Sequence, residues 1–155
     1  MSDEYDDMAL EAERYAALVS EMQGVDENLL RYGLNHDYDV IVSEALDCII
    51  SIGKVDDFID QIINLYNDEQ SYIVSGRLII CSALFHDDEM KKSVDKLNYD
   101  RRDKYFQAWE NAAEYISSGD SEALRRIKLL ADVPDRTVAS VSNSLLEFLK
   151  MGEWK

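Results

Sequence analysis

The chain has 155 residues, 46% of them hydrophobic, so it is long enough for one domain with a core and too apolar for a disordered protein. A single proline and six glycines argue against a β architecture built on many turns. The 32 acidic and 16 basic residues give a net charge of −16, which opposes binding to nucleic acid or an anionic membrane and attracts cationic partners.

Signals for export or membrane insertion are not expected. The first residues, MSDEYDD, lack the basic start and apolar stretch of a secretory signal. The longest apolar run, residues 78–85, is too short to cross a bilayer. Cys48 and Cys81 fall in apolar runs and are expected to be buried free thiols of a reducing compartment. Together these features predict a cytoplasmic protein.

Helices are predicted from the start of the chain, where apolar residues recur at helical spacing over residues 3–22. Asp26 is suited to cap a short second helix that ends before residues 35–39. The third helix is expected to end at Gly53, because glycine commonly follows the last helical turn.

A repeated apolar pattern follows, with steps of four, four and three residues and offsets of 31, 33 and 33 residues between copies. Its four copies are Ile41-Ala45-Ile49-Ile52, Tyr72-Gly76-Ile80-Ala83, Tyr105-Trp109-Ala113-Ile116 and Val138-Ser142-Leu146-Leu149. Shorter apolar helices fall between them. The pattern therefore predicts pairs of one short and one long helix, repeated along the chain.

The stretch from Asp37 to Gly53 resembles the second helix of a HEAT-like repeat, and residues 133–138 resemble the same turn before the last helix. The resemblance covers about residues 26–151. It implies an all-α fold, a short right-handed solenoid of antiparallel helical hairpins, and it implies no particular function. The period is short for HEAT repeats, and the usual basic residue after the valine of the turn is absent. An irregular helical bundle is the alternative.

We expect a single domain over residues 1–155. It would consist of an N-terminal capping helix and four hairpin repeats, at residues 1–23, 26–53, 54–85, 87–118 and 120–151. Trp109 stands where the other copies have Ala, Gly or Ser, so the third repeat is expected to be irregular. The pattern does not predict an oligomeric state.

The sequence shows no motif for catalysis or for a cofactor. His36 and His86 each precede acidic residues, which leaves a metal site open, but acidic residues at helix starts cap the backbone without a metal. A calcium-binding loop that starts at Asp37 would need glycine at its sixth position, where this sequence has Val42, so such a loop is not expected. We therefore expect no catalytic, cofactor-binding or metal-binding residues, and no enzyme.

The acidic residues are unevenly distributed. Residues 1–70 contain 18 acidic and 3 basic residues, whereas residues 71–155 contain 14 and 13. Several tyrosines lie beside the acidic residues, and rigid aromatic area combined with carboxylates suits contact with a basic protein. The candidate partner-binding residues are Asp37, Tyr38, Asp39, Glu44, Asp47, Asp68 and Glu69.

These features favour an acidic immunity-type protein that neutralises a cationic toxin, such as a nuclease, by covering its basic surface. One alternative is an adaptor or scaffold domain of a cytosolic complex, and another is a nucleic-acid mimic whose carboxylates replace phosphates. An enzyme is the least favoured class, because the DNA-repair enzymes with HEAT-like folds need a basic groove that this chain lacks.

Overall fold

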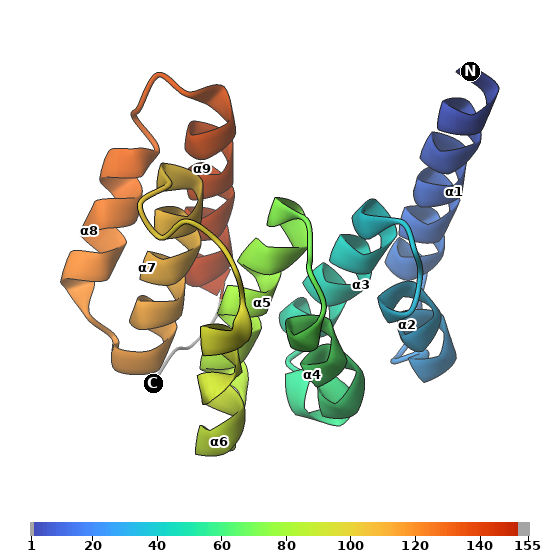
Figure 1. Cartoon of the computed structure of the whole chain (residues 1–155), viewed down its shortest axis with the longest axis horizontal. Coiled ribbons are helices and arrows are strands. Elements are labelled where there is room, and N and C mark those ends of the chain that lie inside the picture. Colours follow the sequence, from blue (N-terminus) through green and yellow to red (C-terminus); the bar gives the residue numbers. More distant parts are fainter. Residues whose placement is uncertain (1, 152–155) are drawn as a thin grey trace. The chain divides into compact units, whose positions relative to one another are not determined.

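The computed structural model describes the backbone of residues 2–151 and the side chains of residues 7–150, and it is helical with short connections (Figure 1). No strand occurs within residues 2–151, so the prediction of an all-α fold is confirmed. Among these residues, no helix is both long enough and apolar enough to cross a membrane.

The helices follow one another with short turns between them, as Figure 1 shows. In chain order they are α1 (Ser2–Ser20), α2 (Glu27–Leu34), α3 (Asp39–Ser51), the 3-10 helix η1 (Val55–Phe58), α4 (Ile59–Asn67), α5 (Tyr72–Leu84), α6 (Asp88–Lys91), the 3-10 helix η2 (Lys92–Lys96), α7 (Lys104–Ser118), α8 (Ser121–Leu130) and α9 (Arg136–Met151). The predicted cap of the second helix is confirmed, because the Asp26 carboxylate accepts the Leu29 N–H at 3.1 Å.

The chain divides into two compact units, Met1–Arg77 and Leu78–Lys155, and the division falls within α5. Each unit contains its own group of buried apolar side chains. The expectation of a single domain over residues 1–155 stays a prediction.

The repeated pattern predicts three of the seven buried positions of α3. Ile41, Ala45 and Ile49 are fully buried there, whereas Ile52 is 37% exposed because it follows the last residue of the helix. The prediction fails at Tyr72, which is 56% exposed in the first turn of α5. Ile52 and Tyr72 lie at helix ends, where the chain turns away from the buried stripe, whereas Leu146 is only half-buried inside α9 and Leu145 beside it is buried.

A close helix contact holds α1, α2 and α3 together in the first unit. The Tyr15 hydroxyl of α1 donates a hydrogen bond to the Leu29 carbonyl of α2 at 2.9 Å. A Cβ atom at Gly33 would collide with the end of the Tyr15 ring and lie 2.8 Å from the Ala45 Cβ of α3. Ala45 therefore sits at a close helix contact, and its small partner is Gly33.

In the second unit, α7, α8 and α9 pack against one another. Ala108, Ala112 and Ile127 are fully buried at their contacts, and Trp109 is 6% exposed. The expected irregularity of residues 87–118 lies in the short helix, where α6 has only four residues and continues as a 3-10 helix. It does not lie at Trp109, inside a regular α7.

The two cysteines form no disulfide. Cys81 is fully buried, as expected, whereas Cys48 is only half-buried. Burial raises the pKa of the Cys48 thiol, and the nearby carboxylates of Glu44 and Asp47 raise it further. The protonated thiol is therefore favoured at position 48.

The contact at Gly33 predicts a stability defect. Gly33→Ala should lower the free energy of unfolding by about 1–3 kcal/mol, because the added methyl group forces Tyr15 or Ala45 to move. Urea unfolding followed by circular dichroism measures this. The control is Asn28→Ala, at an exposed position of the same helix, which should change stability little. Equal unfolding midpoints for the parent and Gly33→Ala would contradict the close contact.

Candidate functional site

An open depression of about 560 Å³ on the first unit brings predicted site residues together. It is formed by α1, the turn between α2 and α3, and the turn between α4 and α5. Its lining residues are Met8, Glu11, His36, Asp37, Tyr38, Asp39, Glu69, Gln70 and Ser71. Four of the seven candidate residues line it, namely Asp37, Tyr38, Asp39 and Glu69. No lysine or arginine is among the described residues that line it.

His36 connects α1 to the turn between α2 and α3 on one side of this acidic depression. Its Nδ1 accepts the backbone N–H of Tyr38 at 2.9 Å, and its Nε2 lies 2.8 Å from Oε1 of Glu11 on α1. Because Nδ1 is an acceptor here, Nε2 carries the proton and donates to the carboxylate. The hydrogen bond from His36 lowers the pKa of Glu11. The turn that carries Asp37 and Tyr38 is therefore tied to α1 through a side chain.

The turn itself exposes its acidic groups. Asp37 is exposed, and Tyr38 and Asp39 are half-buried at the start of α3. Tyr38 occupies the N-cap position of α3, and its side chain does not cap the helix. Glu69 approaches from the turn after α4 and is also exposed. The carboxylates at the rim are therefore accessible to a partner.

Three predicted residues lie outside the acidic depression. Asp47 is bound on both carboxylate oxygens by Arg77, with Nε–Oδ1 and Nη2–Oδ2 distances of 2.7 and 3.2 Å, so much of its charge is neutralised. Glu44 is half-buried one turn before Asp47 on α3, and burial raises its pKa, with a further rise from Asp47 and an opposing effect of Arg77. Asp68 is exposed at the end of α4 but does not line the depression.

The sequence did not single out Glu11 or Tyr32, and it considered His36 only as a turn residue that could bind a metal together with the acidic residues after it. Two spacings carried the missing signal. Glu11 and Tyr15 are four residues apart on α1 and share one helix face, whereas His36 follows Tyr32 by four residues and lies in the turn after α2. The centroids of the Tyr15 and Tyr32 rings lie 6.1 Å apart, so the ring contact brings α1 and α2 together beside Glu11 and His36.

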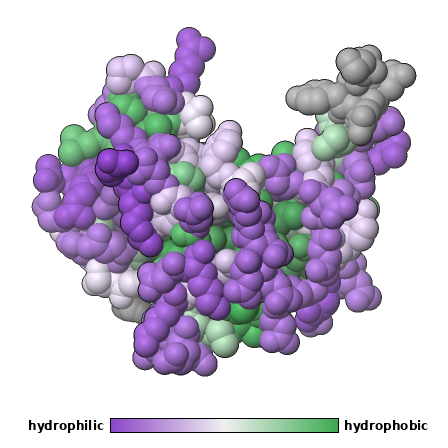
Figure 2. Space-filling view, viewed as in Figure 1, coloured by the Kyte–Doolittle hydropathy of each residue, from purple (hydrophilic) through white to green (hydrophobic). Residues whose placement is uncertain are grey.

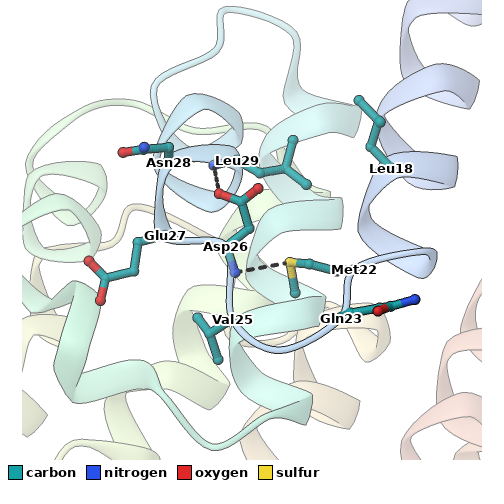
Figure 3. Close-up of a pocket in the computed structure, with 8 residues that line it drawn as sticks. All are labelled: Leu18, Met22, Gln23, Val25, Asp26, Glu27, Asn28 and Leu29. Carbon is teal, nitrogen blue, oxygen red and sulfur yellow. Dashed lines mark hydrogen bonds between the residues drawn. The ribbon is translucent and has the colours of Figure 1, made fainter.

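A second depression, of about 640 Å³, lies at the other end of α1 (Figure 3). It is lined by Leu18, Met22, Gln23, Val25, Asp26, Glu27, Asn28 and Leu29. Two hydrogen bonds of Asp26 hold the turn before α2. Its backbone N–H donates to the Met22 sulfur at 3.4 Å, and its carboxylate accepts the N–H of Leu29. Leu18 and Val25 remain 54% and 46% exposed. This end of α1 therefore combines apolar side chains with two carboxylates.

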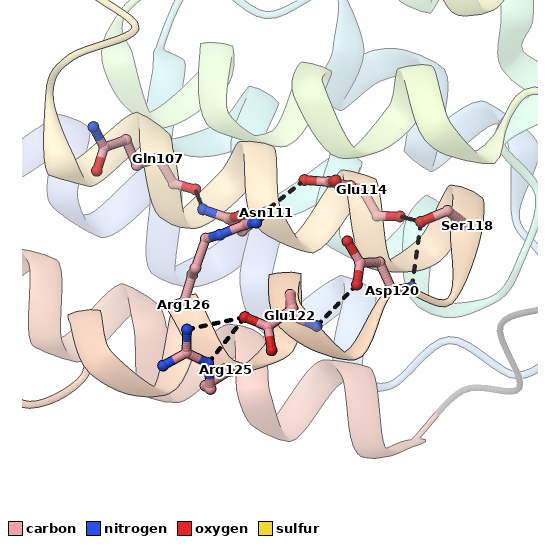
Figure 4. Close-up of polar contacts among 8 residues, drawn as sticks. All are labelled: Gln107, Asn111, Glu114, Ser118, Asp120, Glu122, Arg125 and Arg126. Atoms are coloured by element: carbon pink, nitrogen blue, oxygen red, sulfur yellow. Dashed lines mark hydrogen bonds and ion pairs between the residues drawn. The ribbon is translucent and has the colours of Figure 1, made fainter.

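The charge of the second unit is more balanced. Between α7 and α8, Arg126 donates to Asn111 at 3.1 Å and to Glu114 at 3.4 Å, and Arg125 binds Glu122 within α8 (Figure 4). Residues 78–155 contain 14 acidic and 12 basic residues, a net charge of −2, whereas residues 1–77 contain 18 and 4, a net charge of −14. Hydrophilic side chains cover most of the face seen in Figure 2. The strong negative charge thus belongs to the unit with both depressions.

Within the part of the chain that the structure describes, no three His, Cys, Asp or Glu side chains come close enough to bind a metal ion together. No protein-family model matches the chain, and no curated protein or solved structure matches it. A proposal for its function must therefore depend on the geometry and charge of the first unit.

The raised pKa of Glu44 predicts a pH-dependent effect on stability. A carboxyl whose folded pKa exceeds its ordinary value of 4.5 destabilises the folded state once it ionises, so stability falls as the pH rises through the folded pKa. Glu44→Gln should therefore raise the urea midpoint at pH 7 and leave it unchanged at pH 3, where the parent carboxyl is protonated. The control is Glu13→Gln on an exposed site of α1. A loss of stability at pH 7 would show that ionised Glu44 is stabilising.

Proposed function

We propose that this chain is an immunity-type inhibitor that binds a positively charged protein, such as a nuclease toxin, through the acidic depression on its first unit. One observation carries the proposal. The fold brings Asp37, Tyr38 and Asp39 of one turn beside Glu69 of another, around a depression that none of the described lysines or arginines lines. Asp37 and Glu69, which are 32 residues apart in the sequence, thus contribute to one acidic, tyrosine-bearing surface.

The electrostatics suit a cationic partner. The first unit has a net charge of −14, which attracts basic proteins at long range and speeds their association. At contact, an arginine of the partner can donate two hydrogen bonds to one exposed carboxylate, such as that of Asp37 or Glu69. The same charge repels nucleic acid. The charge of this surface therefore favours binding to a basic nuclease domain and opposes binding to the nucleic acid on which a nuclease acts.

The rigidity of the site also supports binding. The His36 side chain fixes the backbone at Tyr38 through a 2.9 Å hydrogen bond and is itself bound to Glu11. An interface that is ordered before binding loses less conformational entropy when the complex forms. Tyr38 offers aromatic area beside the carboxylates, as interface anchors commonly do.

We also propose that the helical hairpins are repeats of a short right-handed HEAT-like solenoid with α1 as its cap, in a cytoplasmic protein. The offsets of 31, 33 and 33 residues and the alternation of shorter and longer helices support this. In such an arrangement the turns between helices carry the binding residues, as Asp37 and Glu69 would here.

The first test uses the product of the neighbouring reading frame, because inhibitors of this class are encoded beside their toxins. That product should arrest growth when it is expressed alone and should be harmless when it is expressed together with this chain. The purified pair should form a stable complex. If the neighbour is harmless by itself, or remains toxic beside this chain, the proposal is wrong.

The second test locates the contact. The triple variant Asp37→Asn, Asp39→Asn, Glu69→Gln should associate with that toxin about tenfold more slowly than the parent at low salt. The difference should shrink at high salt, where screening weakens attraction for both proteins.

A matched control removes the same number of charges from exposed sites of the second unit, in the variant Asp95→Asn, Asp132→Asn, Glu147→Gln. Its association rate should stay close to that of the parent. Circular dichroism should show that both variants are folded. If the two triple variants slow association equally, net charge alone matters and the depression is not the binding site.

A further inference from the structure

Exposed apolar side chains gather on α1, α2 and the turn between them. Among residues 7–150, eight large hydrophobic side chains are exposed, and five of them belong to these segments. They are Met8, Leu10, Leu18, Val25 and Tyr32, with exposed fractions from 38% to 54%. Exposed apolar residues that cluster in this way mark interaction surfaces more often than isolated ones do.

Most of them lie along one seam, where α1 and α2 run side by side. Met8 lines the acidic depression at one end, and Leu18 and Val25 line the second depression at the other. Tyr32 lies between them, next to Tyr15 and His36. We name this surface the α1–α2 strip, and its members are Met8, Glu11, Leu18, Met22, Val25, Leu29, Tyr32 and His36. From Met8 to Met22 it is about 21 Å long, at 1.5 Å per helical residue.

Tyr32 is the central aromatic side chain of the strip. Its ring meets the His36 ring edge-on, with centroids 5.5 Å apart, and its hydroxyl lies 3.4 Å from Oε1 of Glu11. In spite of these contacts the residue is 54% exposed. A tyrosine that is held on one side and open on the other offers rigid contact area at low entropic cost.

The charges around the strip identify its occupant. Glu11 and Asp37 lie at one end and Asp26 and Glu27 at the other, and no described lysine or arginine lines either depression. A second copy of the chain would place two units of charge −14 against each other. A partner with apolar side chains flanked by basic ones would match the exposed apolar side chains of the strip and the carboxylates at its two ends.

We propose that the α1–α2 strip binds a positively charged amphipathic helix of the partner, with Tyr32, Leu18 and Val25 as its apolar contacts. This inference rests on the proposed function and names the part of the partner that is recognised. A helix is the fitting element, because the backbones of α1 and α2 are hydrogen-bonded within their own helices and offer no strand edge. The 21 Å length corresponds to about 14 residues of a bound helix.

The probe for this proposal is a synthetic 16-residue peptide of leucine, lysine and arginine that places its leucines on one face of a helix. A scrambled peptide of the same composition serves as the first control, since it has the same charge and no apolar face. The full chain is titrated with each peptide at 150 mM NaCl and followed by amide NMR shifts and calorimetry. The amphipathic peptide should bind and shift residues of α1 and α2, and the scrambled peptide should bind at least tenfold more weakly.

Two substitutions test the contacts, each with a control of equal exposure. Tyr32→Ser and Leu18→Ser should each weaken peptide binding about tenfold. Tyr72→Ser and Leu129→Ser, at positions 56% and 58% exposed, should leave it unchanged. Absence of binding, equal binding of the scrambled peptide, or equal effects of test and control substitutions would overturn the proposal. So would dimerisation of the free chain that Leu18→Ser abolishes in sedimentation experiments, because a second copy would then occupy the strip.

The same variants separate this inference from the proposed function. If the neighbouring toxin is inhibited by the parent and equally by Tyr32→Ser and Leu18→Ser, the immunity function stands and the strip is not the helix-binding surface. If the peptide binds the strip but the toxin is not inhibited, the helix-binding surface stands and the immunity function is wrong.

Discussion

The side chain of His36 carries the organisation of the acidic surface. One ring nitrogen binds the backbone of Tyr38 and the other binds Glu11, while the ring packs against Tyr32. Through these contacts a single residue of the turn after α2 connects α1 and α2 to the residue before α3, at the rim of the acidic depression. A neutral imidazole suits this place because it can accept one hydrogen bond and donate another at the same time. Lysine, which only donates hydrogen bonds, could not accept the N–H of Tyr38.

Packing beneath the surface supports the same arrangement. Gly33 leaves room for the Tyr15 ring between α1 and α2, and Tyr15 reaches the carbonyl of Leu29. Tyr15 and Glu11 attach α1 to the segments around α2, and α1 contributes residues to the acidic depression near one end and to the second depression at the other. Gly33 thus permits the contact between α1 and α2 through Tyr15. The charged and apolar side chains of these two helices lie around that contact.

The sequence predicted the helices and much of the core because both follow from periodicity. The buried positions of α3 and the cap at Asp26 depend on neighbours in the chain, and local spacing reports them. Tyr72 was misjudged because a pattern does not show where a helix starts relative to the core. The pairing of Asp47 with Arg77, 30 residues away, neutralised a candidate that the sequence treated as accessible charge. Glu11 and His36 were missed because their contact depends on how α2 packs against α1. Local sequence spacing does not specify that packing.

The tautomer of the His36 ring tests most directly whether this side chain joins α1 to the turn before α3. Nitrogen NMR of the ring at neutral pH distinguishes the two neutral tautomers from the charged form. We expect one dominant tautomer, with the proton on Nε2 and an unprotonated Nδ1 that is coupled across a hydrogen bond to the Tyr38 amide. A proton on Nδ1, or rapid averaging between the tautomers as in a free imidazole, would contradict the link between α1, His36 and Tyr38 on which the acidic surface depends.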